Sequence, residues 1–163
     1  MKANYVVPFR RKREHKTDYG KRLRLLKSRT HRVVVRRSNF QLSLQLVEYN
    51  PSGDKVLKTV LSSDLKKDGW NHSFKSIPAS YLAGVKAGKE FKELCDKAVL
   101  DIGMHRPHKG SRLFASLKGL VDAGLNIPFS EAVFPSKDRL EGKHIQNSKV
   151  GDDFNKVKDK LMS

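Results

Sequence analysis

Residues 40–48 read FQLSLQLVE, and this alternation of apolar and polar side chains decides the fold. It predicts a half-buried strand with Phe40, Leu42, Leu44 and Leu46 on one face and Gln41, Ser43, Gln45 and Val47 on the other. The turn signal of residues 50–54, NPSGD, leads into a further strand, Lys55–Leu61. Upstream, Arg32–Arg37 has three consecutive valines at its centre and reads as another strand. The first half of the chain is therefore expected to be an antiparallel meander.

The second half changes to a helical period. Pro78 suits the first turn of a helix that runs to about Cys95, with an apolar side made by Tyr81, Leu82, Val85, Phe91 and Leu94. The small residues of this helix would allow close packing on the sheet: Ala83, Gly84, Ala87 and Gly88. Residues 98–102 form a short apolar strand that contains Asp101, and Ser111 is placed to cap a second helix that ends near Gly124. Trp70 is interpreted as a core residue, since a large aromatic side chain buries much area.

A third helical stretch covers residues 139–145, and Phe154, Val157 and Leu161 have helical spacing in the charged segment that follows. We divide the chain into a basic arm (residues 1–17), a globular domain (18–150) and a charged C-terminal tail (151–163) that has a helical pattern. The fold class is α/β (α+β), with a mixed sheet of three to five strands and helices packed on it.

Positive charge is concentrated at the N-terminal end. The first 37 residues contain 14 Lys or Arg against only Glu14 and Asp18, whereas the remaining 126 residues contain 20 against 15 acidic residues. Residues 1–17 have no apolar period and are expected to be extended. Asp18 can cap a short basic helix with Tyr19, Leu23 and Leu26 on one face, which we expect to dock on the domain. A basic arm on a nearly neutral body favours a nucleic-acid partner, because each neutralised phosphate releases counterions.

Other classes fit less well. The single cysteine, Cys95, allows no disulfide within the chain, and its helical neighbours indicate a small buried apolar residue. No apolar run is long enough to cross a bilayer, and residues 1–9 lack the apolar core of a secretory signal. We expect an intracellular, soluble protein without a membrane partner.

Five motifs in order make the chain resemble a known family over residues 11–145. They are Lys16-Thr17-Asp18-Tyr19 with Arg22, Leu23, Leu25 and Leu26; Val33-Val34-Val35-Arg36 with Ser38-Asn39; Asp68-Gly69-Trp70; Ala98 to Gly103 followed by Gly110 to Gly119; and Asp122 to Leu125 followed by Pro135, Arg139, Gly142, His144 and Ile145. The chain is similar to the universal large-subunit ribosomal protein family eighteen, which binds 5S rRNA, and to its archaeal and eukaryotic branch. One departure is Lys27-Ser28-Arg29-Thr30-His31, which replaces the small-residue-plus-proline turn common before the first strand.

The resemblance implies a structural constituent of the large ribosomal subunit in the cytoplasm, with no enzymatic activity, cofactor or small-molecule substrate. It implies a fold related in outline to ribonuclease H. Members of the family hold 5S rRNA in the central protuberance and help attach it to large-subunit rRNA, beside neighbouring ribosomal proteins.

The candidate RNA-binding residues form three groups. The arm and first helix supply Phe9, Arg10, Arg11, Lys12, Arg13, Lys16, Thr17, Tyr19, Lys21, Arg22 and Arg24. Arginines offer planar forks to phosphates, and the interleaved aromatics Tyr5, Phe9 and Tyr19 could stack on bases, although packing is favoured for Tyr19. The bend between the first two strands supplies Arg36, Arg37, Ser38 and Asn39 at the sheet edge. The start of the second helix supplies His108, Lys109, Ser111 and Arg112, where free backbone amides favour a phosphate.

Three alternatives remain in view. His105 and His108 suggest a metal, but no further His or Cys lies close enough in sequence to complete a zinc site. Asp101 resembles the metal-binding strand residue of ribonuclease-H-like nucleases, yet only Asp122 and Glu131 could join it, and a role in hydrogen bonding to the backbone is favoured. A general RNA-binding or chaperone-like module without 5S specificity is the main alternative function.

Overall fold

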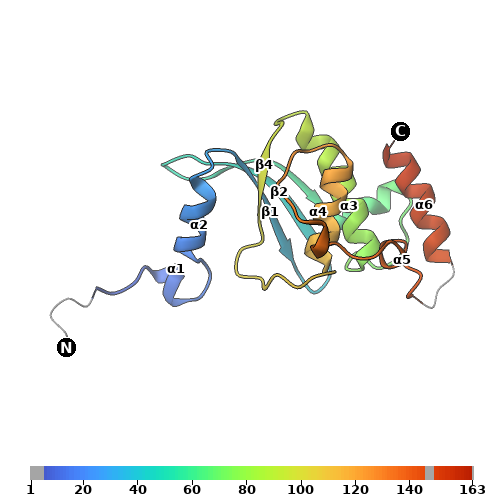
Figure 1. Ribbon diagram of the computed structural model, residues 1–163, viewed down its shortest axis with the longest axis horizontal. Helices are drawn as coiled ribbons and strands as arrows, with labels where there is room; N and C mark the ends of the chain where they lie inside the picture. Colours follow the sequence, from blue (N-terminus) through green and yellow to red (C-terminus); the bar gives the residue numbers. More distant parts are fainter. Residues whose placement is uncertain (1–5, 146–148, 163) are drawn as a thin grey trace.

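Four strands form one mixed sheet in the order β3-β2-β1-β4. The computed structural model describes residues 6–145 and 149–162. Strands β1 (His31–Arg37), β2 (Leu42–Glu48) and β3 (Lys55–Leu61) make the predicted antiparallel meander (Figure 1). Strand β4 (Ala98–Asp101) pairs with β1 in parallel and sets Asp101 opposite Val34. The mixed sheet is thus confirmed, and β1 is a central strand.

One face of the sheet is covered by two long helices, α3 (Ile77–Lys92) and α4 (Arg112–Asp122) (Figure 1). The inward side chains of the meander are buried against them, as the alternation predicts: Val33, Val35, Leu42, Leu44, Leu46 and Val60. Trp70 follows a short 3-10 helix, η1 (Ser62–Asp68), and is 0% exposed, which confirms its place in the core.

Two of the small residues of α3, Gly84 and Gly88, lie against α4, which corrects the prediction that they pack on the sheet. A Cβ added at Gly84 would overlap the backbone carbonyl of Ser116, and one added at Gly119 would overlap the carbonyl of Tyr81. Gly88 in turn lies against Leu120 of α4. The two helices therefore approach each other backbone to backbone, at a distance that only glycine allows.

The strand predicted at residues 40–48 begins two residues later in the structure, at Leu42. Strand β2 begins at Leu42, and Phe40 is 84% exposed, so its assignment to the buried face was wrong. The cause is a side-chain turn, because the Ser38 hydroxyl oxygen accepts from the backbone N–H groups of Phe40 (3.2 Å) and Gln41 (3.0 Å). This local bonding competes with the sheet ladder and turns Phe40 out of the strand.

Two other boundaries differ from the predictions. Helix α3 ends at Lys92, so Leu94 lies beyond it and is 50% exposed, whereas Cys95 is half-buried against the core. The third helical stretch is reduced to α5 (Lys137–Leu140), followed by turns up to residue 145. Short helices of this kind depend on tertiary packing and not on sequence period.

The C-terminal segment is helical, as its spacing predicts. Helix α6 (Lys149–Met162) begins before the expected tail and packs on α3 with Val150, Phe154 and Val157 buried. The division of the chain at residue 150 stays a prediction. Helix α6 and the N-terminal arm lie at opposite ends of the molecule (Figure 1).

The arm is not extended throughout, which corrects a second prediction. Residues 10–13 form the short helix α1 (Arg10–Arg13), whose turn is closed by bonds from the Lys12 and Arg13 amides to the Phe9 carbonyl (2.9 and 3.1 Å). Helix α2 (Tyr19–Leu26) follows, on the side of the sheet away from α3 and α4 (Figure 1). Its predicted cap is confirmed, because the Lys21 amide donates to the Asp18 carboxylate (3.0 Å).

Candidate nucleic-acid interface

Helix α2 is held to the sheet by polar contacts. None of its residues is buried, and Leu23 is 59% exposed. The Arg22 guanidinium instead makes a bidentate pair with the Asp54 carboxylate at 2.7 and 2.8 Å, and the Lys21 ammonium donates to the Gly103 carbonyl at 2.9 Å. The docking that we expected for this helix is therefore made chiefly by charged and polar contacts.

A network of charges continues from this contact across the outer face of the sheet. Arg32, which is only 3% exposed, binds Asp54 at 2.5 Å and Asp101 at 3.1 Å. The Arg36 guanidinium donates to the carboxylate of Asp101 at 3.4 Å and to the backbone carbonyl of Asp101 at 2.8 Å. The hydrogen bond from the Arg22 guanidinium is the largest influence on the pKa of Asp54 and lowers it. Desolvation raises the pKa and Arg32 lowers it, and the net effect is a lowered pKa. Two carboxylates thus pair with three arginines and offset two of their three positive charges.

Asp101 has a structural role in this network. Its carboxylate accepts the Gly103 amide at 2.7 Å in addition to the two arginines, which agrees with the backbone-bonding role favoured above. Asp122, a suggested nuclease partner, binds the Tyr81 hydroxyl at 2.9 Å and Lys118 at 2.9 Å. Within residues 6–145 and 149–162, no group of three or more His, Cys, Asp or Glu side chains could hold a metal ion.

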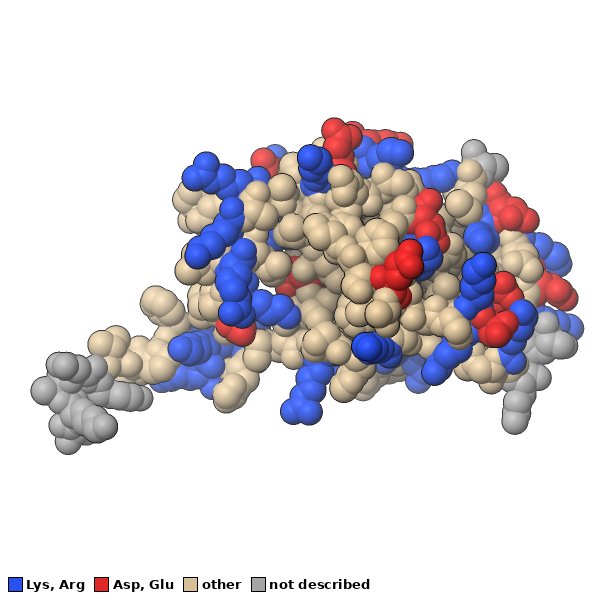
Figure 2. Space-filling view, in the orientation of Figure 1, with Lys and Arg blue, Asp and Glu red and all other residues tan. Residues whose placement is uncertain are grey.

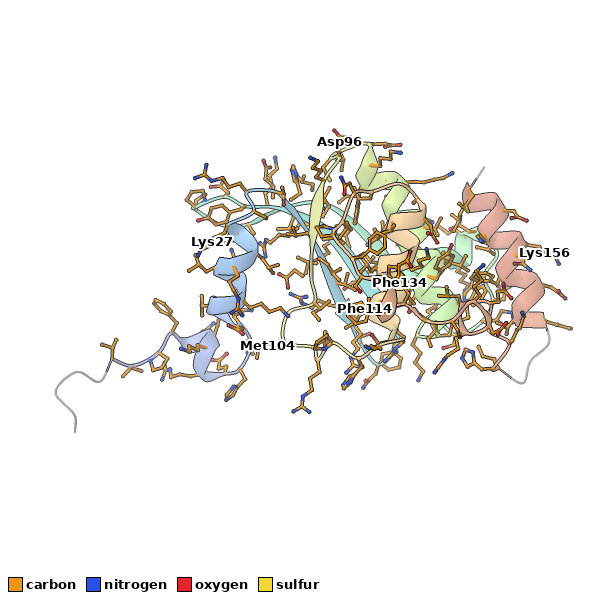
Figure 3. All side chains as sticks on the ribbon, in the orientation of Figure 1. Lys27, Asp96, Met104, Phe114, Phe134 and Lys156 are labelled. Carbon is orange, nitrogen blue, oxygen red and sulfur yellow. The ribbon has the colours of Figure 1, made fainter. Side chains whose placement is uncertain are left out.

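A cavity of about 300 Å³ lies between α2 and the outer face of the sheet. Met104, in the loop after β4, lines it on the α2 side of the sheet (Figure 3). Most of its cations are already bonded within the fold: Lys16 to Glu14, Lys21 to a carbonyl, and Arg22, Arg32 and Arg36 to carboxylates. Arg11 donates to the Thr17 hydroxyl at 2.9 Å. The predicted RNA-binding residues that line this cavity therefore mainly hold the arm and α2 in place, and few of them have an unpaired charge.

The outward side of the arm and α2 carries the free charge. Lys12, Arg13 and Arg24 are exposed and make no ion pair with any described residue, whereas Arg10 has a long contact to Glu14 of 3.6 Å. Figure 2 shows the Lys and Arg side chains gathered over the arm and α2, in contrast to the mixture of both signs over the α6 end. Phe9 is 73% exposed and lies 5.3 Å from Tyr19 between ring centroids, while Tyr5 is outside the described residues.

The other two predicted groups meet at the end of the sheet. Arg37 at the end of β1 and Asn39 in the bend after it line a groove of about 700 Å³ together with Ser111 and Arg112 from the start of α4. The bend follows a central strand and not an edge strand. Ser38 is occupied by the turn, since its hydroxyl oxygen accepts two amides, and His108 and Lys109 are exposed in the neighbouring loop.

Three groove residues were missed as candidate ligands. Lys75 precedes α3, Arg139 belongs to α5, and His144 follows it. In the sequence, Arg139 and His144 are carriers of the family resemblance, and Lys75 belongs to no motif. Only the structure, which brings these three residues together in the groove, identifies them as candidate ligands.

Ser111 precedes α4 as predicted, but its side chain does not cap the helix. The Ser111 hydroxyl is buried and has no hydrogen-bond partner among the described residues. By contrast, the Ser76 hydroxyl at the start of α3 accepts the Ala79 amide at 3.3 Å. The first-turn amides of α4 therefore lack the side-chain acceptor that α3 has.

Comparison with known proteins gives the family. The model for "Ribosomal large subunit proteins 60S L5, and 50S L18" matches residues 3–95 and 89–130. The protein "Large ribosomal subunit protein uL18" of Korarchaeum cryptofilum is 48% identical over 144 residues, 88% of this chain and 74% of that protein. This chain belongs to the uL18 family of large-subunit ribosomal proteins.

Two further uL18 proteins match over nearly their full lengths. The protein of Methanoregula boonei is 46% identical over 151 residues (91% of this chain, 87% of that protein). The protein of Methanococcoides burtonii is 43% identical over 164 residues (98% of this chain, 95% of that protein). Membership of the uL18 family makes the chain a structural ribosomal protein and not an enzyme. None of the helices in the described part of the chain is long and apolar enough to cross a membrane.

Proposed function

We propose that this uL18 chain binds 5S rRNA and helps attach it to large-subunit rRNA in the central protuberance, beside neighbouring ribosomal proteins. The observation that carries the proposal is the outward basic surface of the arm and α2, on which Lys12, Arg13 and Arg24 have no ion pair with any described residue. RNA duplexes are recognised by shape and backbone contact, for which exposed arginine forks and lysine charges are suited. The expected kinship with the ribonuclease H fold stays a prediction.

The polar contacts that hold α2 on the sheet favour a specific RNA-binding surface over a diffuse positive charge. Arg22 and Lys21 fix the helix on the sheet, so the free cations of α2 keep a defined position relative to the body. A preorganised set of charges loses less freedom on binding than a flexible arm does. Phe9, exposed beside Tyr19, adds an aromatic face on which an unpaired base can stack.

The test is competition binding to 5S rRNA and to an unrelated RNA of similar size across a salt series. We expect the preference for 5S rRNA to persist at high salt, because shape-specific contacts remain when counterion release is weakened. Equal binding of both RNAs that collapses with salt would instead favour a general RNA-binding or chaperone-like module.

The variant K12A/R13A tests the arm itself. We expect its affinity for 5S rRNA to fall at least about tenfold, through the loss of two charge-assisted contacts. The slope of log K against log salt should become shallower by up to about 2. The matched control is K66A/K67A, which removes two exposed lysines from η1. Equal behaviour of the two variants would remove the arm from the interface.

A further inference from the structure

The groove at the end of the sheet is basic, and none of the described residues that line it is acidic. Its lining, drawn from four separate segments, comprises Arg37, Asn39, Ser73, Lys75, Ser76, Ile77, Gly110, Ser111, Arg112, Arg139, His144 and Ile145. Three arginines and a lysine therefore converge on about 700 Å³ of open space. Like charges brought together without a counter-ion raise the energy of the fold, so such a cluster indicates an anionic partner.

The cations of this groove are free, unlike those beneath α2. Arg37, Lys75 and Arg139 have no ion pair with any described residue, and each of them is exposed. Among the described residues, Arg112 donates only to the Lys75 carbonyl, at 3.0 Å. The cations of the groove are thus not paired with carboxylates, whereas Arg22, Arg32 and Arg36 beneath α2 are.

Two further features lie at the same place. Helices α3 and α4 both begin at the groove, and their positive ends add to the potential there. Phe40 follows the groove residue Asn39 and is 84% exposed, held out of β2 by the Ser38 turn. An exposed aromatic beside arginine forks is typical of a surface that binds an RNA strand, whereas an acidic polypeptide would not require it.

We propose that this groove binds the phosphate backbone of a second RNA segment, separate from the RNA held by the arm and α2. The proposal rests on the RNA-binding function proposed above and adds a second binding face to it. Arg37, Lys75, Arg112 and Arg139 contact phosphates, and Phe40 stacks on an unpaired base at the rim. One chain then holds two RNA segments on different surfaces of its body.

The experiment uses the full chain bound to immobilised 5S rRNA, with a fluorescent RNA hairpin that has an unpaired loop as the second probe. We expect the wild-type complex to bind the hairpin. The groove variant K75E/R139E should bind it at least about tenfold more weakly while keeping its affinity for 5S rRNA. The control K66E/K67E makes the same charge change on η1 and should bind like the wild type.

A second variant guards against misfolding. F40A removes a side chain that is 84% exposed, so it should leave the circular dichroism spectrum and the thermal midpoint unchanged and still weaken hairpin binding. If the wild-type complex does not bind the hairpin, or if K75E/R139E binds it as the control does, the second face is refuted. Equal competition by polyglutamate would also refute it, in favour of an acidic protein partner. Failure of the proposed function has a different signature, namely the absence of any preference for 5S rRNA in the immobilisation step.

Discussion

Asp54→Asn should destabilise the fold although Asp54 lies in a surface turn. The carboxylate accepts Arg22 at 2.7 and 2.8 Å and Arg32 at 2.5 Å, and the Arg32 side chain is 3% exposed. Removal of one partner from a fully buried pair costs about 3–5 kcal/mol, because it leaves an uncompensated charge. Arg32 retains Asp101, so we expect about 2–3 kcal/mol from this contact. The partly exposed Arg22 pair adds at most about 1 kcal/mol.

The assay is denaturant unfolding at pH 7, with thermal unfolding as a second measure. A loss of about 3 kcal/mol should lower the thermal midpoint by roughly 6–12 °C for a chain of this size. Arg22→Ala removes only the outer contact and should cost no more than about 1 kcal/mol. Asp138→Asn is the matched control, because Asp138 is also ion-paired, to Lys143 at 2.8 Å, but is 73% exposed; we expect no measurable change.

The pH dependence gives the sign of the effect. The pKa of Asp54 is lowered in the fold from its ordinary value of 3.8, chiefly by its hydrogen bond to Arg22. A lowered pKa stabilises the folded state at every pH above the ordinary value, and this contribution is lost as the pH falls through the folded-state pKa. The difference between wild type and D54N should therefore be constant from pH 7 to about pH 5 and shrink below 3.8. A difference within error at pH 7, or one that persists unchanged in acid, would refute the reasoning.

Two further predictions concern the helix crossing and the basic end of the sheet. Gly119→Ala should destabilise the fold by at least about 1–3 kcal/mol in denaturant unfolding, because its Cβ would overlap the Tyr81 carbonyl. The control Gly20→Ala, in exposed α2, should be neutral or stabilising by up to about 1 kcal/mol. Equal effects of the two variants would contradict the close crossing of α3 and α4. The pKa of His105 is lowered by desolvation first and then by Arg37, Arg36, Arg112 and Lys21, so RNA bound at the groove should raise it by neutralising part of that charge. NMR titration of the His105 imidazole with and without the RNA hairpin checks this, and an unchanged or lower pKa would count against phosphate at Arg37 and Arg112.

The parts of the fold that depend on local pattern could be predicted from the sequence. Alternation places Leu42, Leu44 and Leu46 on the buried face, and Asp18 and Pro78 mark helix starts that the structure confirms within a residue or two. Prediction failed where a local hydrogen bond competed with the pattern, as the Ser38 hydroxyl does when it turns Phe40 outward. It also failed for Gly84, because spacing shows that a small residue is needed but not which element approaches it.

The site was predicted in composition more than in arrangement. Sequence reasoning found the basic arm, since a run of charges is visible along the chain. It assigned Arg22 and Arg36 to RNA on charge alone, whereas their carboxylate partners lie 32 and 65 residues away in sequence. It did not connect Arg37 with Lys75 and Arg139, because their spacing in the sequence does not show that the end of β1, the segment before α3 and α5 meet. Pairing and convergence over such separations are properties of the tertiary structure.

The parallel pairing of β4 with β1 has a consequence for the order of events during synthesis. The first carboxylate partner of Arg32, Asp54, is made 22 residues after it, but its second partner, Asp101, is made 69 residues after it. Closing so long a loop is slow compared with forming a hairpin. The basic arm is thus fully synthesised and available to polyanions while one side of β1 still lacks its neighbour. In a growing chain, the proposed attraction of the arm to RNA would precede completion of the sheet, and early contact with RNA would hold the nascent chain until β4 is made.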